Sequence, residues 1–267
     1  MDIADYRDAG AVNSNLATGV ATGVPASAGA TDTLISVEAL CGGKSGDTFR
    51  GLDRLGNLGE TLRGGGGNDT LDGGTGIDTA EWLGSLADYT ITRTPGTMSI
   101  VVAHKNAGAD GSDSLVNIEH LQFADRIVAF GPRAEDVARV AFALWTPGIY
   151  ASQTLFSKGI SFYDNENNYS FDVLCQVALQ YHPETGAALA AKLKASLPAS
   201  SFTEGRLLDI MIANGGATSD TGRAAAVKAV ALDAAMTQQL ELTGVTTKGV
   251  VATLNFDAEF FFGLLPG

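Results

Sequence analysis

Residues 64–81 read GGGGNDTLDGGTGIDTAE, which is two consecutive blocks of nine residues, 64–72 and 73–81. Both blocks begin with glycines and carry an aspartate at the sixth position, a threonine at the seventh and an apolar residue at the eighth. Self-similarity at a fixed period is the sequence signature of a chain that stacks copies of one small unit. The repeat therefore predicts a stacked architecture for this part of the chain.

Two further blocks precede this pair, GGKSGDTFR at 42–50 and LGNLGETLR at 55–63, with a four-residue insertion between them. Their columns agree with those of the first pair. The acidic column comprises Asp47, Glu60, Asp69 and Asp78, and the apolar column comprises Phe49, Leu62, Leu71 and Ala80. A flexible glycine-rich loop would not preserve an apolar column at this spacing, so we expect ordered units.

Each column has a physical interpretation. Glycine permits the positive φ angles of a tight turn, and the alternation that follows the acid is typical of a very short strand whose eighth residue faces inward. Stacked turns bring their carboxylates close together, and like charges so arranged repel each other unless a cation lies between them. Carboxylate and carbonyl oxygens suit Ca²⁺ far better than zinc or copper. The expected ligand is therefore calcium.

Residues 64–80 resemble the GGxGxDxUx nonapeptide of RTX (repeats-in-toxin) proteins, whose repeats wind into a calcium-loaded parallel β-roll. The resemblance extends over roughly residues 1–130. It implies that alternate turns lie on the same side of the roll, with calcium between them. Asp47 would then lie near Asp69, and Glu60 near Asp78.

The same resemblance implies the remaining calcium ligands. Backbone carbonyls would complete the coordination shells around Gly64, Gly66, Gly73 and Thr75. The first two turns depart from the family pattern, because Ser45 and Leu58 stand at the fourth-position glycine and Glu60 replaces the aspartate. A second acidic turn supplies two lesser calcium candidates, Asp110 and Asp113.

The flanks of the repeat share a pattern of their own. Residues 32–40 and 113–121 both have the form D-[ST]-L-x-x-[IV]-E-x-L, which is similar to segments that precede and close RTX rolls. Between the repeat and the second of these segments, residues 88–93 and 98–102 predict a β-hairpin about Pro95 and Gly96.

From Arg133 onward the sequence is rich in alanine and leucine and predicts about five helices, near 134–145, 170–181, 183–197, 203–214 and 219–241. Glycine and negative charge are concentrated before this point: residues 1–130 hold 21 of the 33 glycines. We therefore expect an α+β multidomain protein, with a β-roll and flanking strands at 1–131 and an all-α bundle at 132–267.

Several observations bear on location. The two cysteines, Cys41 and Cys175, are too few for a disulfide framework. No apolar run approaches the ~18 residues that a membrane span needs, and the acidic N-terminus does not resemble a Sec-type signal. The tail at 254–265 combines an acidic pair with clustered aromatics. It is compatible with the uncleaved type I secretion signal that the RTX resemblance implies, and equally with a segment that docks on the helices.

Catalytic motifs are missing from the sequence. It has no H-E-x-x-H, its three histidines are scattered, and no serine lies in a G-x-S-x-G context. Residues 43–45 read Gly-Lys-Ser, as at the end of a P-loop, but the leading glycine of that motif is missing. The acidic run at 164–168 resembles the start of an EF-hand loop, but Tyr169 stands where that loop needs glycine. A net charge of −13 disfavours nucleic acid as a partner.

We therefore expect a secreted bacterial calcium-binding protein without enzymatic activity. Its role would be structural or adhesive, in a surface layer, a matrix or another extracellular assembly. Its partners would be calcium ions and either further copies of itself or a cell-surface component. Two alternatives remain open: the targeting half of a larger RTX exoenzyme or toxin, and a carbohydrate- or protein-recognition module.

Overall fold

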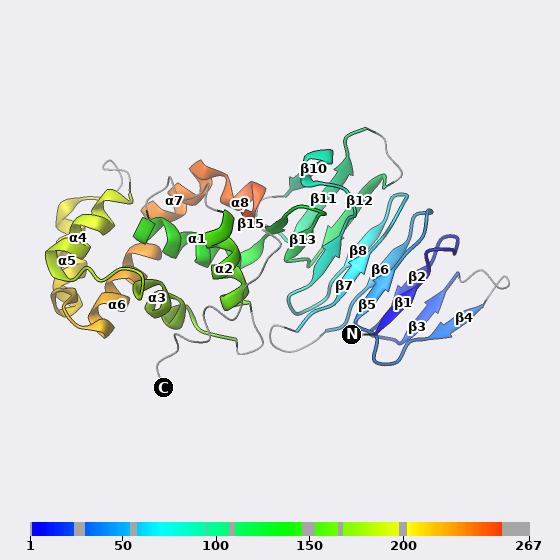
Figure 1. The fold of residues 1–267 in the computed structure, drawn as a ribbon, viewed down its shortest axis with the longest axis horizontal. Helices are drawn as coiled ribbons and strands as arrows, with labels where there is room; N and C mark the ends of the chain where they lie inside the picture. Colours follow the sequence, from blue (N-terminus) through cyan, green and yellow to red (C-terminus); the bar gives the residue numbers. More distant parts are fainter. Residues whose placement is uncertain are drawn as a thin grey trace. The chain divides into compact units, whose positions relative to one another are not determined.

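The computed structural model describes residues 2–23, 30–53, 58–94, 96–106, 110–145, 153–164, 168–197 and 202–252. This part of the chain is mixed α/β, with two β-sheets and eight α-helices (Figure 1). The chain divides into two compact units, residues 1–130 and 131–267. Four features of the sequence fall outside the described residues: the start of the block at 55–63, the hairpin turn at Pro95, most of the acidic run at 164–168, and the tail from Leu254 onward.

Each nine-residue block of the first unit contributes one three-residue strand, which begins at its threonine. The four strands are β6 (Thr48–Arg50), β7 (Thr61–Arg63), β8 (Thr70–Asp72) and β9 (Thr79–Glu81). Their middle residues, Phe49, Leu62, Leu71 and Ala80, are at most 1% exposed. The predicted inward-facing apolar column is therefore confirmed.

Alternate blocks pair with each other. β6 lies parallel to β8, with Thr48 opposite Thr70, and β7 lies parallel to β9, with Thr61 opposite Thr79. Successive strands consequently alternate between the two sheets. A slip of one residue would turn each apolar side chain outward, so burial of the eighth column fixes this register.

The flanking segments extend both sheets within the first unit (Figure 1). One sheet has the order β1-β5-β7-β9-β13-β14, where β1 is Ile3–Asp5, β5 is Ala39–Cys41, β13 is His120–Gln122 and β14 is Ile127–Ala129. The other has the order β10-β11-β12-β8-β6-β2-β3-β4, where β10 is Tyr89–Arg93, β11 is Ser99–His104, β12 is Ser112–Val116, β2 is Asn13–Asn15, β3 is Val20–Thr22 and β4 is Thr31–Thr33. β10 and β11 form the predicted antiparallel hairpin.

The D-[ST]-L-x-x-[IV]-E-x-L segments join the same rows of buried side chains. Leu40 pairs with Leu62, and Leu121 pairs with Ala80, so the last leucine of each segment takes the place of an eighth-position residue. Both leucines are at most 1% exposed. Each fully buried side chain of this kind contributes about 1.5–3 kcal/mol.

The second unit is built from helices. They are α1 (Gly131–Trp145), α2 (Gln153–Tyr163), α3 (Phe171–Leu179), α4 (Gly186–Ala195), α5 (Glu204–Ala213), α6 (Asp220–Ala231), α7 (Ala234–Thr243) and α8 (Val245–Lys248), followed by strand β15 (Val250–Ala252). Ser170 caps α3 and Thr203 caps α5, each accepting a backbone N–H. None of the described helices has the length and apolar character needed to cross a membrane.

The expectation of about five helices and an all-α second part was wrong in four places. The segment 219–241 is two helices, because Asp233 accepts the Ala235 N–H and begins α7 instead of continuing α6. Helices α2 and α8 were not predicted, and the last described element, β15, is a strand.

Candidate metal centre

Three acidic residues form a row along one edge of the first unit, here called the first acidic ladder: Asp47, Asp69 and Asp113. The Asp47 N–H donates to Oδ1 of Asp69 at 2.7 Å, and the Asp69 N–H donates to Oδ1 of Asp113 at 3.0 Å. The structure thus brings Asp47 and Asp69 together, as the RTX resemblance implied. Asp113 continues this row.

A second acidic ladder comprises Glu60, Asp78 and Glu119. The Glu60 N–H donates to Oδ1 of Asp78 at 2.7 Å, and the Asp78 N–H donates to Oε2 of Glu119 at 2.9 Å. Glu119 was not among the predicted site residues. The signal was nevertheless in the sequence, because the glutamate of the D-[ST]-L-x-x-[IV]-E-x-L pattern directly precedes β13, as Asp78 directly precedes β9.

The parallel pairing of the strands explains why the acids line up. Asp47, Glu60, Asp69 and Asp78 are each the last residue before a strand, whereas Asp113 lies within β12. The carbonyl oxygen of each of these four acids accepts an N–H from the paired strand, which for Asp47 and Glu60 is that of the threonine that begins it. The Thr70 N–H donates to Asp47 O at 2.9 Å, and the Thr79 N–H donates to Glu60 O at 2.8 Å. The main chain therefore fixes the acids of one ladder at the spacing of neighbouring strands.

The carboxylates in the middle of the two ladders, those of Asp69 and Asp78, are buried and incompletely hydrogen-bonded. Asp69 and Asp78 are 2% and 0% exposed, and among the described residues the Oδ2 atoms of both have no hydrogen-bond partner. Burial, with smaller contributions from the neighbouring Glu119 and Glu60, raises the pKa of Asp78 to about 8. Burial likewise raises the pKa of Asp69, with Asp113 and Asp47 adding to the shift. A buried carboxylate in this position needs a proton or a cation.

Glycines leave the space beside these carboxylates open. A Cβ at Gly64 would stand 2.0 Å from Oδ2 of Asp69, and a Cβ at Gly73 would stand 2.7 Å from Cγ of Asp78. A Cβ at Gly42 would lie 2.2 Å from both Oδ2 of Asp47 and the carbonyl oxygen of Gly64. Glycine therefore permits a backbone carbonyl and a carboxylate to converge.

The second ladder repeats this arrangement. A Cβ at Gly51 would stand 2.2 Å from the carbonyl oxygen of Gly73 and 3.0 Å from Oε2 of Glu60. Gly64 and Gly73, both predicted as ligands, thus direct carbonyl oxygens toward Asp47 and Glu60. Carboxylate and carbonyl oxygens are the ligands that hard divalent cations prefer, with Ca²⁺ the most tolerant of irregular geometry.

Other predicted ligands have different surroundings. Gly66 and Thr75 donate their N–H groups to the carbonyls of Gly43, at 2.7 Å, and Leu52, at 3.3 Å. Asp110 accepts the hydroxyl of Tyr89. Oδ2 of Asp113 accepts Nε1–H of Trp82 at 2.8 Å, so both oxygens of Asp113 have donors. Asp113, the last acid of the first ladder, is therefore satisfied by hydrogen bonds.

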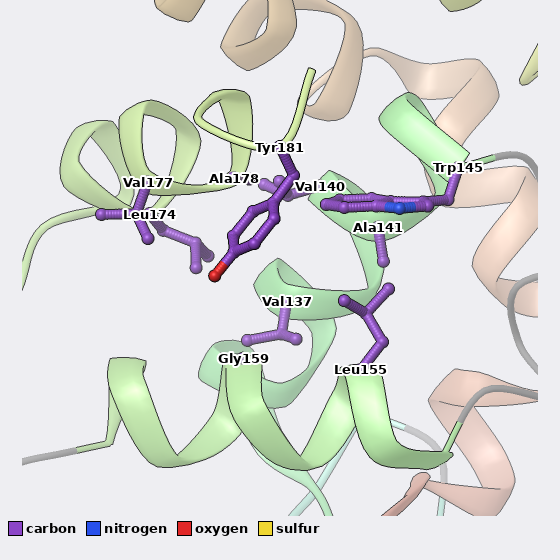
Figure 2. A pocket seen from close by; sticks show the side chains of 10 residues that line it. All are labelled: Val137, Val140, Ala141, Trp145, Leu155, Gly159, Leu174, Val177, Ala178 and Tyr181. Carbon is purple, nitrogen blue, oxygen red and sulfur yellow. The ribbon is translucent and has the colours of Figure 1, made fainter. Parts of the chain in front are cut away.

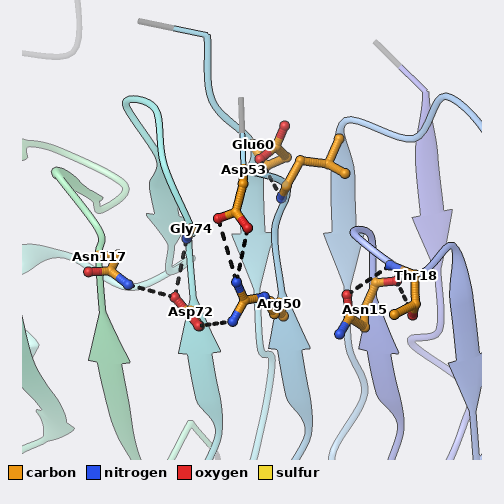
Figure 3. Close-up of polar contacts among 9 residues, drawn as sticks. Asn15, Thr18, Arg50, Asp53, Glu60, Asp72, Gly74 and Asn117 are labelled. Carbon is orange, nitrogen blue, oxygen red and sulfur yellow. Dashed lines mark hydrogen bonds and ion pairs between the residues drawn. The ribbon is translucent and has the colours of Figure 1, made fainter. Parts of the chain in front are cut away.

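Two charged side chains at the ninth position of the blocks, Arg50 and Asp72, differ from the ladders, because they are paired with each other and with further side chains (Figure 3). Arg50 contacts Asp72 at 3.1 Å and Asp53 at 3.3 Å, and Asn117 donates to Asp72 at 2.9 Å. Such exposed pairs contribute little to stability, about 0–1 kcal/mol each. Since these charges compensate one another, they do not require a cation.

Over the described residues, no three side chains of histidine, cysteine, aspartate or glutamate gather around a common point. The candidate sites instead combine one or two carboxylates with backbone carbonyls. No family model matches the chain, and a search of the curated proteins finds no significant relative.

Proposed function

We propose that residues 1–131 form a calcium-loaded parallel β-roll of the RTX type, and that the protein is a secreted bacterial structural or adhesive component without catalytic activity. One observation carries the proposal. The two acidic ladders bury carboxylate oxygens to which no described residue donates a hydrogen bond, and glycines leave room for backbone carbonyls beside them. A bound cation would satisfy both features.

The residues present fit Ca²⁺. Asp47 with the Gly64 carbonyl and Glu60 with the Gly73 carbonyl would supply oxygen ligands, and the unpartnered Oδ2 atoms of Asp69 and Asp78 would supply two more. The ion would neutralise repulsion within each ladder and so stabilise the stacked turns.

An extracellular location would supply calcium at the concentration that sites of this kind need. Calcium sites of extracellular modules bind with Kd of about 10⁻⁴–10⁻³ M, far above cytosolic calcium. A ligand that binds only the folded state stabilises it by mass action. Folding would therefore be coupled to type I export, which delivers the chain to calcium. A structural or adhesive role implies self-association or a cell-surface partner.

Calcium titration of the full chain tests the proposal. We expect calcium, but not the same concentration of magnesium, to increase the β-sheet circular dichroism and to raise the melting temperature, with reversal by EDTA. The double variant Asp69→Asn/Asp78→Asn should lose most of this response. The control variant Asp53→Asn, whose side chain is 57% exposed, should keep it. An unchanged spectrum and melting temperature on calcium removal would contradict the proposal.

Light scattering tests the assembly role separately. Calcium-dependent growth in particle mass would support a structural or adhesive function over the alternatives of a targeting segment or a recognition module. A monomer that binds calcium without assembling would retain the calcium proposal and overturn the structural role.

A further inference from the structure

An apolar groove runs between two helices of the second unit that pack against each other, α4 and α5 (Figure 1). Its two walls differ in the size of their side chains, since α4 supplies small residues and α5 supplies large apolar ones. Ala187, Ala190 and Ala191 line it from α4, and Leu208, Met211 and Ile212 line it from α5. On both helices these residues recur at helical spacing, so the groove follows the two helices along their length.

The groove has the size of a binding site. Its volume is about 440 Å³, within the range of roughly 300–1,000 Å³ that is usual for ligand sites. By contrast, the apolar hollow among α1, α2 and α3 measures about 40 Å³ and is bounded by the rings of Trp145 and Tyr181 (Figure 2). Of these two apolar sites, the groove between α4 and α5 is the one with room for a partner.

Helix α5 exposes more apolar surface than its packing on α4 uses. Leu207 and Met211 are each 6% exposed, whereas Leu208 is 59% and Ile212 is 67% exposed. The two exposed side chains are four residues apart and therefore project from the same face of α5. Large apolar side chains gathered beside a groove mark a site of interaction.

The charges at the groove disfavour an ionic ligand. Lys194 and Glu204 form an ion pair with each other, and among the described residues that line the groove they are the two charged ones. An anionic group would meet Glu204 and a cationic group would meet Lys194. Because the surface carries one charge of each sign, it is complementary to a second copy of itself.

The same surface also holds both halves of a helix–helix contact. The small side chains of Ala187, Ala190 and Ala191 let another helix approach closely, and Leu208 and Ile212 are of the size that fills such a hollow. A patch that carries both can pair with itself across a two-fold axis, because each half then meets the opposite half on the other copy.

We propose that the groove between α4 and α5 is the contact between two copies of this chain, in which α5 of each copy places Leu208 and Ile212 against the α4 alanines of the other. The contact is a bundle of four helices, two from each copy. The proposal deepens the structural role proposed above, and rests on it for its biological purpose, by naming a second copy as the partner. Since α4 and α5 belong to the second unit, the contact does not require calcium.

Sedimentation equilibrium of the full chain over a range of concentrations tests the proposal, in EDTA and in calcium. We expect a monomer–dimer equilibrium in both conditions. Leu208→Glu buries a charge in the contact and should raise the Kd of the dimer by roughly tenfold or more. Leu242→Glu makes the same substitution at a leucine of α7 that is 70% exposed and does not line the groove, so it should leave the Kd unchanged.

A second matched pair distinguishes a complementary contact from general adhesion of apolar surfaces. Ala190→Leu adds apolar surface but fills the groove, so it should weaken the dimer. Ala188→Leu adds the same surface at an exposed position of α4 that does not line the groove, and it should leave the dimer unchanged. Helical circular dichroism should be retained in all four variants.

Three results would overturn the proposal. The first is a chain that stays monomeric at every concentration, whatever other molecule or segment then covers the groove. The second is a dimer that survives Leu208→Glu or that Ala190→Leu strengthens, and the third is a dimer that forms only in calcium. The calcium response of the circular dichroism, which tests the proposed function, can succeed or fail independently of these results.

Discussion

A single methyl group is enough to test the glycine positions of the repeat. At Gly64 a Cβ would stand 2.0 Å from Oδ2 of Asp69 and 2.5 Å from its Cγ, so the carboxylate or the turn must move. Overpacking of this kind typically costs 1–3 kcal/mol. We therefore expect Gly64→Ala to lower the free energy of unfolding of residues 1–130 by about 1–3 kcal/mol and to weaken the calcium response, both measured by urea denaturation with and without calcium.

Gly10 supplies the control for Gly64. A Cβ at Gly10 meets nothing within 4 Å, and its φ lies outside the left-handed region. Gly10→Ala should change the free energy of unfolding by less than about 0.5 kcal/mol. Equal effects at the two positions would contradict the crowding argument.

Burying the charge of Asp78 opposes folding unless a cation is bound. Substitution by asparagine separates this cost from the contribution of Asp78 as a calcium ligand. Asparagine keeps the Oδ1 acceptor for the Glu60 N–H but removes a buried charge whose pKa is raised by burial to about 8. Without calcium, we expect Asp78→Asn to raise the free energy of unfolding by about 1–3 kcal/mol. With calcium, the variant should be less stable than the native chain, since it has lost a ligand. Thermal melts in both conditions measure the crossover, and a variant destabilised equally in both would refute it.

At the scale of elements, β12 contributes the last acid of the first acidic ladder, Asp113. Trp82 Nε1–H donates to Asp113 at 2.8 Å, and the Trp82 ring stacks on Phe123 at 5.2 Å. Trp82→Phe keeps an aromatic ring but leaves a buried carboxylate oxygen without its donor, so we expect a loss of about 1–3 kcal/mol. Circular dichroism during urea unfolding measures it.

A double-mutant cycle distinguishes the hydrogen bond from packing. If the bond matters, Trp82→Phe should cost less in an Asp113→Asn background than in the native chain, because the oxygen to be satisfied no longer carries the same charge. Strict additivity of the two substitutions would show that packing alone accounts for the loss.

The strands of the repeat could be predicted from the sequence more completely than the ends of the helices. The strands of the repeat follow from a nine-residue period, since each block must bury its eighth residue and can do so only by pairing with the next block but one. The helices were harder to delimit. Asp233 breaks 219–241 through a local hydrogen bond to the Ala235 N–H, which competes with helix continuation and is invisible to apolar periodicity.

The site shows the same contrast. Asp47, Glu60, Asp69 and Asp78 could be found from their column, and the structure places them in two ladders. Glu119 lies in a segment without the nonapeptide pattern. The glutamate of the D-[ST]-L-x-x-[IV]-E-x-L pattern marks it in the sequence, and the pairing of β13 with β9 places it in the second ladder. The donor for Asp113 was likewise unpredictable, because Trp82 is distant in sequence and meets it only through the fold.

At the scale of the whole molecule, the two units should respond to different conditions. The acidic ladders belong to residues 1–130, whereas the second unit contains a buried histidine, His182, which is 6% exposed. Its ring meets Trp145 edge-on at a centroid distance of 4.2 Å, and Nε2 has no hydrogen-bond partner within the described residues. Calcium should therefore shift the unfolding of the first unit, and mild acid that of the second.

The direction of the acid effect follows from the pKa of His182. Burial, together with the positive charges of Lys192 and Arg223 and against the opposing effect of Glu184, lowers this pKa to about 4. In the unfolded chain the pKa is near 6.5. Between these values the unfolded state binds more protons than the folded state, so stability falls as the pH drops from about 6.5 to about 4 and levels off below.

His182→Gln removes the titrating group and should remove most of this slope. For the native chain we expect the second unit to lose about 1–3 kcal/mol of unfolding free energy between about pH 6.5 and about pH 4. Urea denaturation at constant calcium, followed by the helical signal at 222 nm, measures it in both proteins. His104 is the matched control, since it lies on β11 of the first unit. An acid-induced loss in the second unit that survives His182→Gln, or that His104→Gln removes instead, would show that burial of His182 is not its cause.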